Sequence, residues 1–381
     1  ERAIEETSNE NTFLQSKLRN AEVIESMGML GHLLHRWKAK HLSAAKAAEL
    51  SQEEAHKIGA LIKFVQYTLQ SLTLGIGALL VIEGQLTAGA MIAANFLVAR
   101  ALQPIQMIVA TWRQSFQAKQ AFEALEKLLA NNPPYSQRLI KTPDVGLIEV
   151  KDLVASAPQR QEPILKGINA TFKPGDVIVI VGPSGSGKST FARCLLGIWP
   201  FVTSGQVNLD GEDVRVWDKN LLGPHIGYLP QDIELLDGTI AENIARFGDV
   251  DSEKVIEAAS SVGIHDTILR MPQGYDTPIG EAGRRLSGGQ RQRLGLARAL
   301  YGKPMMMVLD EPNANLDDVG EMALYKVVAE MRAQGKTTFL ISHRPAAMQI
   351  ADVVMIINNG QIQAMGPKEQ ILNSAAPQNI S

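Results

Sequence analysis

The sequence has a single cysteine and little net charge, and it does not open with a secretory signal. One cysteine, Cys194, excludes an internal disulfide framework and is typical of a protein in a reducing compartment. The net charge of −3 argues against a broad nucleic-acid surface, so we expect no nucleic-acid partner. Because the first residue is Glu rather than Met, we expect a fragment or a processed product.

Charge is also missing from two long apolar stretches. No residue from Phe64 to Ile82 is charged, and Arg100 is the only charge between Ala90 and Trp112. Each stretch is about long enough to cross a bilayer, which predicts transmembrane helices at about residues 62–83 and 88–112. Bases flank the outer ends and the turn between the stretches has an acid but no base, so both ends should face the cytoplasm. The alternative is a pair of buried core helices.

The composition changes at Gly146. Residues 1–130 are predicted to form long helices of a partial transmembrane domain, and residues 131–145 a linker with Asn and Pro. Over residues 146–376, short β-rich runs alternate with helical ones, which predicts an α/β domain with a mostly parallel sheet. Residues 377–381 are expected to form a tail.

A glycine-rich loop follows the strand pattern DVIVIV. Its sequence GPSGSGKS matches G-x-x-x-x-G-K-[ST] in full, and a helical pattern follows it. In such a P-loop, backbone N–H groups wrap nucleotide phosphates, the lysine reaches the β- and γ-phosphates, and the serine binds Mg²⁺. We therefore predict an α/β P-loop ATPase domain, after an all-α partial transmembrane domain, with ATP and Mg²⁺ as cofactors. The expected ATP-binding residues are Gly182, Pro183, Ser184, Gly185, Ser186, Gly187, Lys188, Ser189 and Thr190.

Further polar side chains follow apolar strand patterns. MMMVLDEP ends in two carboxylates that point opposite ways, so Asp310 is expected to bind Mg²⁺ and Glu311 to activate or position the attacking water. His343 follows TTFLIS and is expected at the γ-phosphate, because parallel-strand tips hold ligands in α/β domains. Gln231 follows IGYLP, where its amide could bind Mg²⁺ or water.

A second glycine-rich segment, LSGGQ, begins another predicted helix well after the first loop. One ATP cannot occupy two separate loops unless the fold joins them, and a two-fold homodimer achieves this. In that dimer the segment of one copy covers the ATP in the P-loop of the other, and hydrolysis opens the dimer. The residues expected to bind the γ-phosphate across the interface are Ser287, Gly288, Gly289 and Gln290.

These motifs, in this order, resemble the ATP-binding-cassette (ABC) family over nearly all of Gly146–Pro367. The resemblance implies that Asp317, in NANLD, lies at the dimer interface. It also implies that Glu281, in TPIGEAG, contacts the membrane domain. Residues 1–17 would end a fourth membrane helix and residues 20–31 would form a short coupling helix. The two apolar stretches would be the fifth and sixth of six helices.

GYLPQDIELLDGTIAENIARF, GYDTPIGEAGRRLSGGQRQRLGLARALYG and RNAEVIESMGMLGHLLHRW are similar to type I protein-secretion permease/ATPases. That similarity implies ATP-driven export of proteins with a C-terminal signal, by a multi-pass protein of the bacterial inner membrane with a cytoplasmic ATPase domain. The implied partners are a second copy of the chain, membrane lipid, a periplasmic adaptor (membrane fusion protein) and an outer-membrane channel.

One departure concerns the nucleotide base. Family cassettes stack adenine on an aromatic residue ahead of the P-loop, whereas Ala157 takes that place here, so weak base selectivity is expected. Two other functions fit part of the pattern. The first is an ABC exporter of lipids or small amphiphiles. The second is a soluble ABC ATPase acting on DNA, which the basic run around LSGGQ supports and the uncharged hairpin opposes.

Overall fold

The computed structural model describes residues 11, 13, 14, 17, 21–131, 139–157 and 162–374. The chain divides into two compact units, Glu1–Pro134 and Tyr135–Ser381, and each is described by itself. Most of the predicted fourth membrane helix, part of the predicted linker and the whole predicted tail fall outside the described residues.

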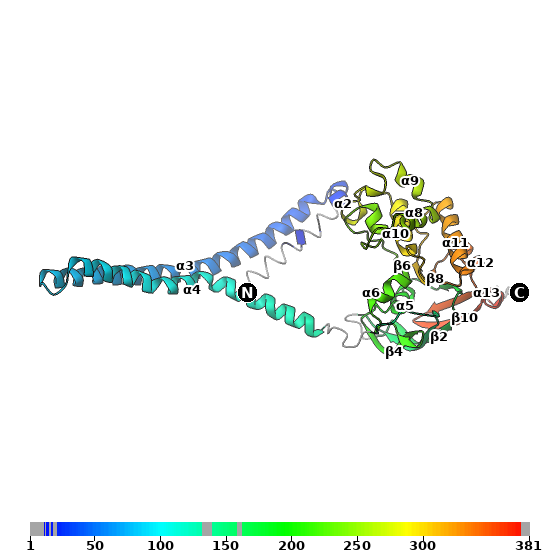
Figure 1. Cartoon of the computed structure of the whole chain (residues 1–381), viewed down its shortest axis with the longest axis horizontal. Helices are drawn as coiled ribbons and strands as arrows, with labels where there is room; N and C mark the ends of the chain where they lie inside the picture. Colours follow the sequence, from blue (N-terminus) through cyan, green and yellow to red (C-terminus); the bar gives the residue numbers. More distant parts are fainter. Residues whose placement is uncertain are drawn as a thin grey trace. The chain divides into compact units, whose positions relative to one another are not determined.

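The first unit is helical. It contains α2 (Ala21–Ser26), α3 (Leu30–Ile82) and α4 (Ala88–Asn131). Helices α3 and α4 lie side by side as a hairpin (Figure 1). A Cβ on Gly77 would lie 2.6 Å from Met91 Cγ, so glycine lets the two helices approach closely there. Helix α2 lies within the segment predicted to couple the membrane helices to a cassette, and that role stays a prediction.

One part of α3 is long and apolar enough to cross a membrane. Gly59–Ile82 has 24 residues and a mean hydropathy of 1.5, and 6% of its most apolar window is buried. The core helix of a soluble protein would be mostly buried, so this low share favours a membrane span over the alternative of a core helix. In α4, Ala88–Ala101 is a shorter apolar helix, and the second predicted span stays a prediction.

The second unit is built on a six-stranded sheet with the order β10-β9-β3-β8-β7-β6. Neighbouring strands are parallel except β9 and β10, which confirms the predicted α/β fold. All residues of β7 and β8 are buried, as expected for a parallel sheet covered on both faces. The strands are β3 (Val177–Val181), β6 (Ile226–Leu229), β7 (Met306–Asp310), β8 (Thr337–Ile341), β9 (Val353–Asn358) and β10 (Gln361–Pro367).

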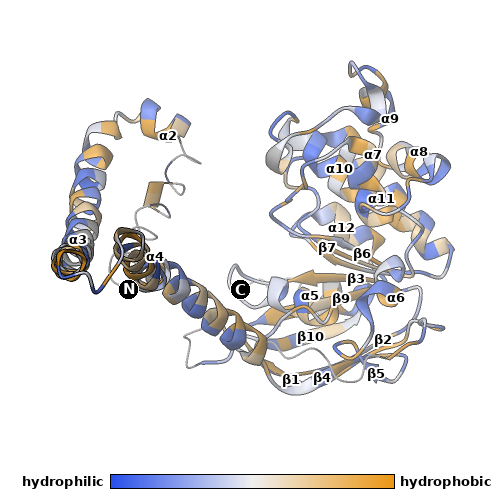
Figure 2. Ribbon diagram, turned by 60° about the vertical axis from the view of Figure 1, so that its left-hand side comes forward, coloured by the Kyte–Doolittle hydropathy of each residue, from blue (hydrophilic) through white to orange (hydrophobic). Residues whose placement is uncertain are grey.

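A smaller antiparallel sheet has the order β2-β1-β4-β5. Its strands are β1 (Ile148–Ala155), β2 (Leu165–Phe172), β4 (Val202–Leu209) and β5 (Glu212–Asp213). Alternate side chains of β3 point to opposite faces of the larger sheet. Val177 and Val179 therefore join a core with the helices, whereas Ile178 and Ile180 join a second core with the smaller sheet. In Figure 2 the hydrophobic colour is concentrated on the strands that lie between the helices and the smaller sheet.

Helices pack against the two sheets, and several of them begin at local capping signals. Thr239 and Ser287 each form a capping box, and Asp251 and Asp317 accept backbone N–H groups at the starts of α8 and α11. The helices are α5 (Lys188–Leu195), α6 (Lys219–Leu222), α7 (Ile240–Ile244), α8 (Ser252–Ser261), α9 (His265–Leu269), α10 (Gly288–Leu300), α11 (Asp318–Ala333), α12 (Pro345–Ile350) and α13 (Lys368–Ser374).

The described end of the predicted linker is held against the smaller sheet. The Asp210 carboxylate accepts the backbone N–H groups of residues 144–147, at 2.8, 3.1, 2.8 and 2.9 Å. Upstream, the Leu139 N–H donates to Val216 O at 2.8 Å. The chain from residue 139 onward is therefore part of the second unit.

Candidate active site

The P-loop connects β3 to α5 and requires glycine at two positions. Gly182 has a φ of +151° and Gly187 a φ of +105°. A Cβ on Gly182 would lie 1.9 Å from Ile357 O, and one on Gly187 would lie 2.8 Å from Leu165 Cδ2. Side chains at these positions would collide with β9 and β2, so both strands help to set the shape of the loop.

Lys188 is buried at the start of α5, with 7% of the residue exposed. Its Nζ donates to Gly182 O at 2.7 Å and to Pro183 O at 2.9 Å. Burial lowers the pKa of this ammonium, and the charges of Glu311 and Asp310 oppose that shift. The P-loop and the end of β7 therefore belong to one site. A phosphate would be a stronger acceptor for Lys188 than the two carbonyl groups.

Ser186 Oγ and Asp310 Oδ1 are buried and have no hydrogen-bond partner among the described residues. Burial raises the pKa of the Asp310 carboxyl, a hydrogen bond from Ser189 lowers it, and the charge of Glu311 raises it. A carboxylate beside a serine hydroxyl offers the oxygen ligands that Mg²⁺ prefers. These residues fit the predicted ion, and the Ser186 hydroxyl fits a phosphate oxygen.

The fold brings Gln231 and Glu311 together from opposite ends of the helical segment between β6 and β7. Gln231 Nε2 donates to Glu311 Oε2 at 3.3 Å. Glu311 has a left-handed backbone, with a φ of +50° that is uncommon for a residue with a side chain. His343 is exposed and follows β8 by two residues. Because β6, β7 and β8 are parallel neighbours, all three residues lie at the same edge of the sheet.

The SGGQ segment forms the exposed start of α10. Ser287 Oγ accepts the Gln290 N–H at 3.3 Å, and Gln290 Oε1 accepts the Ser287 N–H at 2.8 Å. The side chains of both residues therefore cap the helix. A Cβ on Gly289 would lie 3.1 Å from Asn315 O, so the loop after β7 packs closely on this segment. In the part of the chain that the structure describes, no hydrogen bond or ion pair joins SGGQ to the P-loop.

Comparisons with known proteins identify this arrangement. A family described as ABC transporter matches residues 165–314, which contain the P-loop, β7 and the SGGQ segment. The type I secretion system ATP-binding protein PrsD of Rhizobium meliloti (strain 1021) is 43% identical over 373 residues, which are 97% of this chain and 64% of PrsD. Residues 165–314 therefore form an ABC transporter domain.

Two further similarities extend over nearly the whole chain. The leukotoxin translocation ATP-binding protein LktB of Mannheimia haemolytica is 32% identical over 97% of the chain and 52% of its own length. A solved structure of a bacterial Atm1-family ABC exporter with ATP bound superposes with a TM-score of 0.86 at 25% identity, over 100% of this chain and 68% of that one. The chain thus spans between half and two thirds of the length of the curated relatives PrsD and LktB.

Two polar side chains of α10 make contacts that the sequence analysis did not predict, although Arg293 belongs to the basic run around LSGGQ. Arg293 forms an ion pair with Asp317, the residue predicted at the dimer interface, whose side chain is still 64% exposed. Gln292 is fully buried and donates to Pro312 O at 2.6 Å. Helical periodicity could have revealed Gln292, because it lies on the same face as the buried residues Leu296 and Ala299.

The position predicted to lack an adenine-stacking ring is Ala157, which is half-buried at the end of β1. Residues 158–161, which follow it, lie outside the described residues. The preceding residue, Ser156, contacts an aromatic pair: its N–H donates to Phe201 O at 2.8 Å, and its carbonyl accepts Trp199 Nε1 at 3.0 Å. The ring centroids of Trp199 and Phe201 are 6.0 Å apart.

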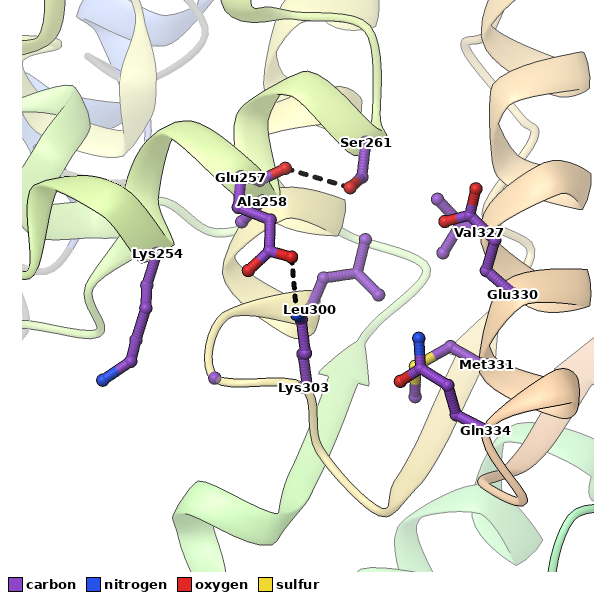
Figure 3. A pocket seen from close by; sticks show the side chains of 11 residues that line it. Lys254, Glu257, Ala258, Ser261, Leu300, Lys303, Val327, Glu330, Met331 and Gln334 are labelled. Carbon is purple, nitrogen blue, oxygen red and sulfur yellow. Dashed lines mark hydrogen bonds and ion pairs between the residues drawn. The ribbon is translucent and has the colours of Figure 1, made fainter.

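A small cavity lies between α8, the end of α10 and α11, and none of the predicted ATP-binding or catalytic residues lines it (Figure 3). Its volume is 70 Å³, and its charges are paired within the cassette. Lys303 Nζ lies 2.6 Å from Glu257 Oε1, and Lys254 Nζ lies 2.9 Å from Asp251 Oδ2. The first pair joins the turn after α10 to α8, and the second lies within the first turn of α8. We assign the cavity no part in nucleotide binding.

Proposed function

We propose that this chain is part of a type I secretion permease/ATPase, which uses ATP to export proteins across the inner membrane. The observation that carries the proposal is the 43% identity to PrsD over 97% of the chain. The LktB similarity supports it, because that protein is also named for translocation of a secreted protein. The P-loop and the polar residues at the ends of β6, β7 and β8 supply the ATPase site.

Each site residue has a proposed task in ATP hydrolysis. Lys188 and the P-loop N–H groups bind the phosphates. Ser189, Asp310 and Gln231 would hold Mg²⁺, which would neutralise negative charge on the phosphates when bound. Glu311 accepts a proton from the attacking water or positions it, and Gln231 orients the Glu311 carboxylate through their hydrogen bond. His343 is proposed to contact the γ-phosphate.

The composite site requires a homodimer. Ser287, Gly288, Gly289 and Gln290 are exposed or half-exposed at the start of α10, which supports their use across an interface. Helix N-termini attract anions because their N–H groups are unpaired and the helix dipole is positive there. The exposed Asp317 would lie at the same interface. ATP would therefore join the two cassettes, and its hydrolysis would release them.

The proposal places the two apolar helices in the bacterial inner membrane, in contact with lipid, and the cassette in the cytoplasm. A periplasmic adaptor and an outer-membrane channel would complete the path for a cargo protein with a C-terminal signal. Export of lipids or small amphiphiles is the second candidate, because an ABC exporter whose description names no protein cargo superposes on the whole chain.

The test is ATP turnover of the complete membrane protein in lipid, titrated with C-terminal segments of candidate secreted proteins. A saturable change in rate that depends on the segment would support protein export. A response to lipids or small amphiphiles, with none to any segment, would favour the second candidate. Glu311→Gln is the matched control: it should bind ATP and hydrolyse it at least about 100-fold more slowly, because general-base catalysis contributes that much or more.

A further inference from the structure

The turn that carries Glu311 is held by contacts from outside its own strand. The Glu311 N–H donates to Ile341 O at 3.0 Å, and Glu311 O accepts the Ala314 N–H at 3.2 Å. The next carbonyl, that of the buried Pro312, accepts Gln292 Nε2 at 2.6 Å. A left-handed backbone is unfavourable at a residue with a Cβ and persists only where its surroundings impose it. These hydrogen bonds are such surroundings.

The contact from Gln292 differs from the others because it comes from a separate helix. Gln292 lies in the first turns of α10, two residues after the SGGQ segment ends at Gln290, and none of its surface is exposed. Among the described residues its Oε1 has no hydrogen-bond partner, and the hydrogen bond to Pro312 O is the one polar contact of this amide. Burying an amide for a single backbone contact is costly unless that contact is needed.

We propose that Gln292 is a positioning residue for Glu311, linking the helix that begins with SGGQ to the turn that aims this carboxylate. Gln292 is fully buried and acts through the Pro312 carbonyl. Its hydrogen bond holds the peptide plane between Pro312 and Asn313, which follows Glu311 by one residue. A displacement of the start of α10, where the γ-phosphate of the other copy's ATP would bind, is passed through Gln292 to the Glu311 of the same chain. The inference rests on the proposed role of Glu311.

The connection has a direct chemical consequence. If Gln292 is replaced by leucine, Pro312 O keeps its burial and loses its donor, so the turn relaxes and the Glu311 carboxylate moves. A displacement of about 1 Å at a reacting group can lower a rate on the order of 100-fold. We therefore expect Gln292→Leu to lower kcat by about 10- to 100-fold while KM for ATP changes little, because the P-loop contacts are unaltered.

The test is single-turnover ATP hydrolysis by the complete protein in lipid, for wild type, Gln292→Leu, Glu311→Gln and the double variant. If Gln292 acts through Glu311, Gln292→Leu slows wild type but has no further effect in Glu311→Gln. The inference would be overturned if Gln292→Leu lowered the hydrolysis rate by the same factor in wild type and in Glu311→Gln. It would also be overturned if Gln292→Leu changed only the KM for ATP. Unchanged turnover in Glu311→Gln would instead contradict the proposed role of Glu311, so the two failures are distinguishable.

Two further variants separate positioning from folding. Asn243 is also a fully buried amide, and it donates to Leu236 O at 2.9 Å and Thr239 O at 3.0 Å, away from Glu311. Asn243→Leu should lower thermal stability without changing kcat per folded molecule. Should Gln292→Leu not fold, Gln292→Glu replaces it, since a buried carboxyl donates to Pro312 O only when protonated. Its kcat relative to wild type should therefore rise as the pH falls, and a pH-independent ratio would refute the inference.

Discussion

Gly360 lies in the turn between β9 and β10, and its replacement by alanine tests how the P-loop is supported. The residue has a φ of +79°. Its N–H donates to Ser186 O in the P-loop at 3.1 Å, and its carbonyl accepts the Lys166 N–H at 2.8 Å. A Cβ at this position would lie 2.0 Å from Ile164 O. Because that distance is much shorter than a van der Waals contact, the turn must move. Its movement weakens the hydrogen bonds that join it to β2 and to the P-loop.

The expected cost follows from three contributions. The positive φ costs about 1 kcal/mol once a Cβ is present. Each of the two backbone hydrogen bonds that the movement weakens contributes about 1 kcal/mol. Gly360→Ala should therefore destabilise the cassette by about 3 kcal/mol, or roughly 6–12 °C in Tm at about 2–4 °C per kcal/mol for a domain of this size. Gly211, with a φ of +87° and no atom within 4 Å of its Cβ position, isolates the first contribution.

The assay compares thermal unfolding and ATP binding for the two variants. Gly211→Ala should lower Tm by about 2–4 °C, the effect of its φ alone, and leave ATP affinity unchanged. Gly360→Ala should lower Tm more and weaken ATP binding, because Ser186 loses the contact that holds its carbonyl. Equal losses of Tm in the two variants, with ATP affinity intact in both, would show that the turn does not support the P-loop.

Three other changes test separate parts of the site. Lys188→Met should weaken ATP binding about 10- to 100-fold, since a hydrogen bond to a charged group contributes about 1.5–3 kcal/mol; unchanged affinity in an equilibrium titration would exclude the lysine from phosphate binding. Burial raises the pKa of the Asp310 carboxyl, so the folded chain holds this proton more tightly than the unfolded chain does. The bound proton therefore contributes to folding stability in full below pH 3.8, and this contribution is lost as the pH rises through the raised pKa. Asp310→Asn should thus be more stable than wild type at neutral pH, measured by thermal unfolding, yet lose Mg²⁺-dependent turnover; a lower Tm would contradict the assigned cost of burial. Asp210→Asn should increase hydrogen exchange at residues 144–147 about 10-fold or more, because one amide oxygen cannot replace a carboxylate that accepts four N–H groups; unaltered protection would rule out Asp210 as their anchor.

Sequence patterns predicted the features that depend on a short stretch of chain. The buried strands β3, β7 and β8 are nearly continuous apolar runs, and a parallel sheet covered on both faces requires such runs. The P-loop was predictable because its glycines, lysine and serine are consecutive. The smaller antiparallel sheet was largely missed. Its strand β1 mixes buried and exposed residues with a bulge, so it has neither a continuous apolar run nor strict alternation.

By itself, the sequence determined the ABC cassette, the order of its motifs and the apolar helix, because each is encoded by neighbouring residues. The tertiary structure alone decided which distant side chains meet. Gln231 donates a hydrogen bond to Glu311, Asp210 accepts backbone N–H groups at the end of the linker, and Gln292 donates from α10 to the turn after β7. Such contacts depend on which faces of strands and helices pack together. Packing of the whole cassette also imposes the left-handed backbone of Glu311, which local preference disfavours.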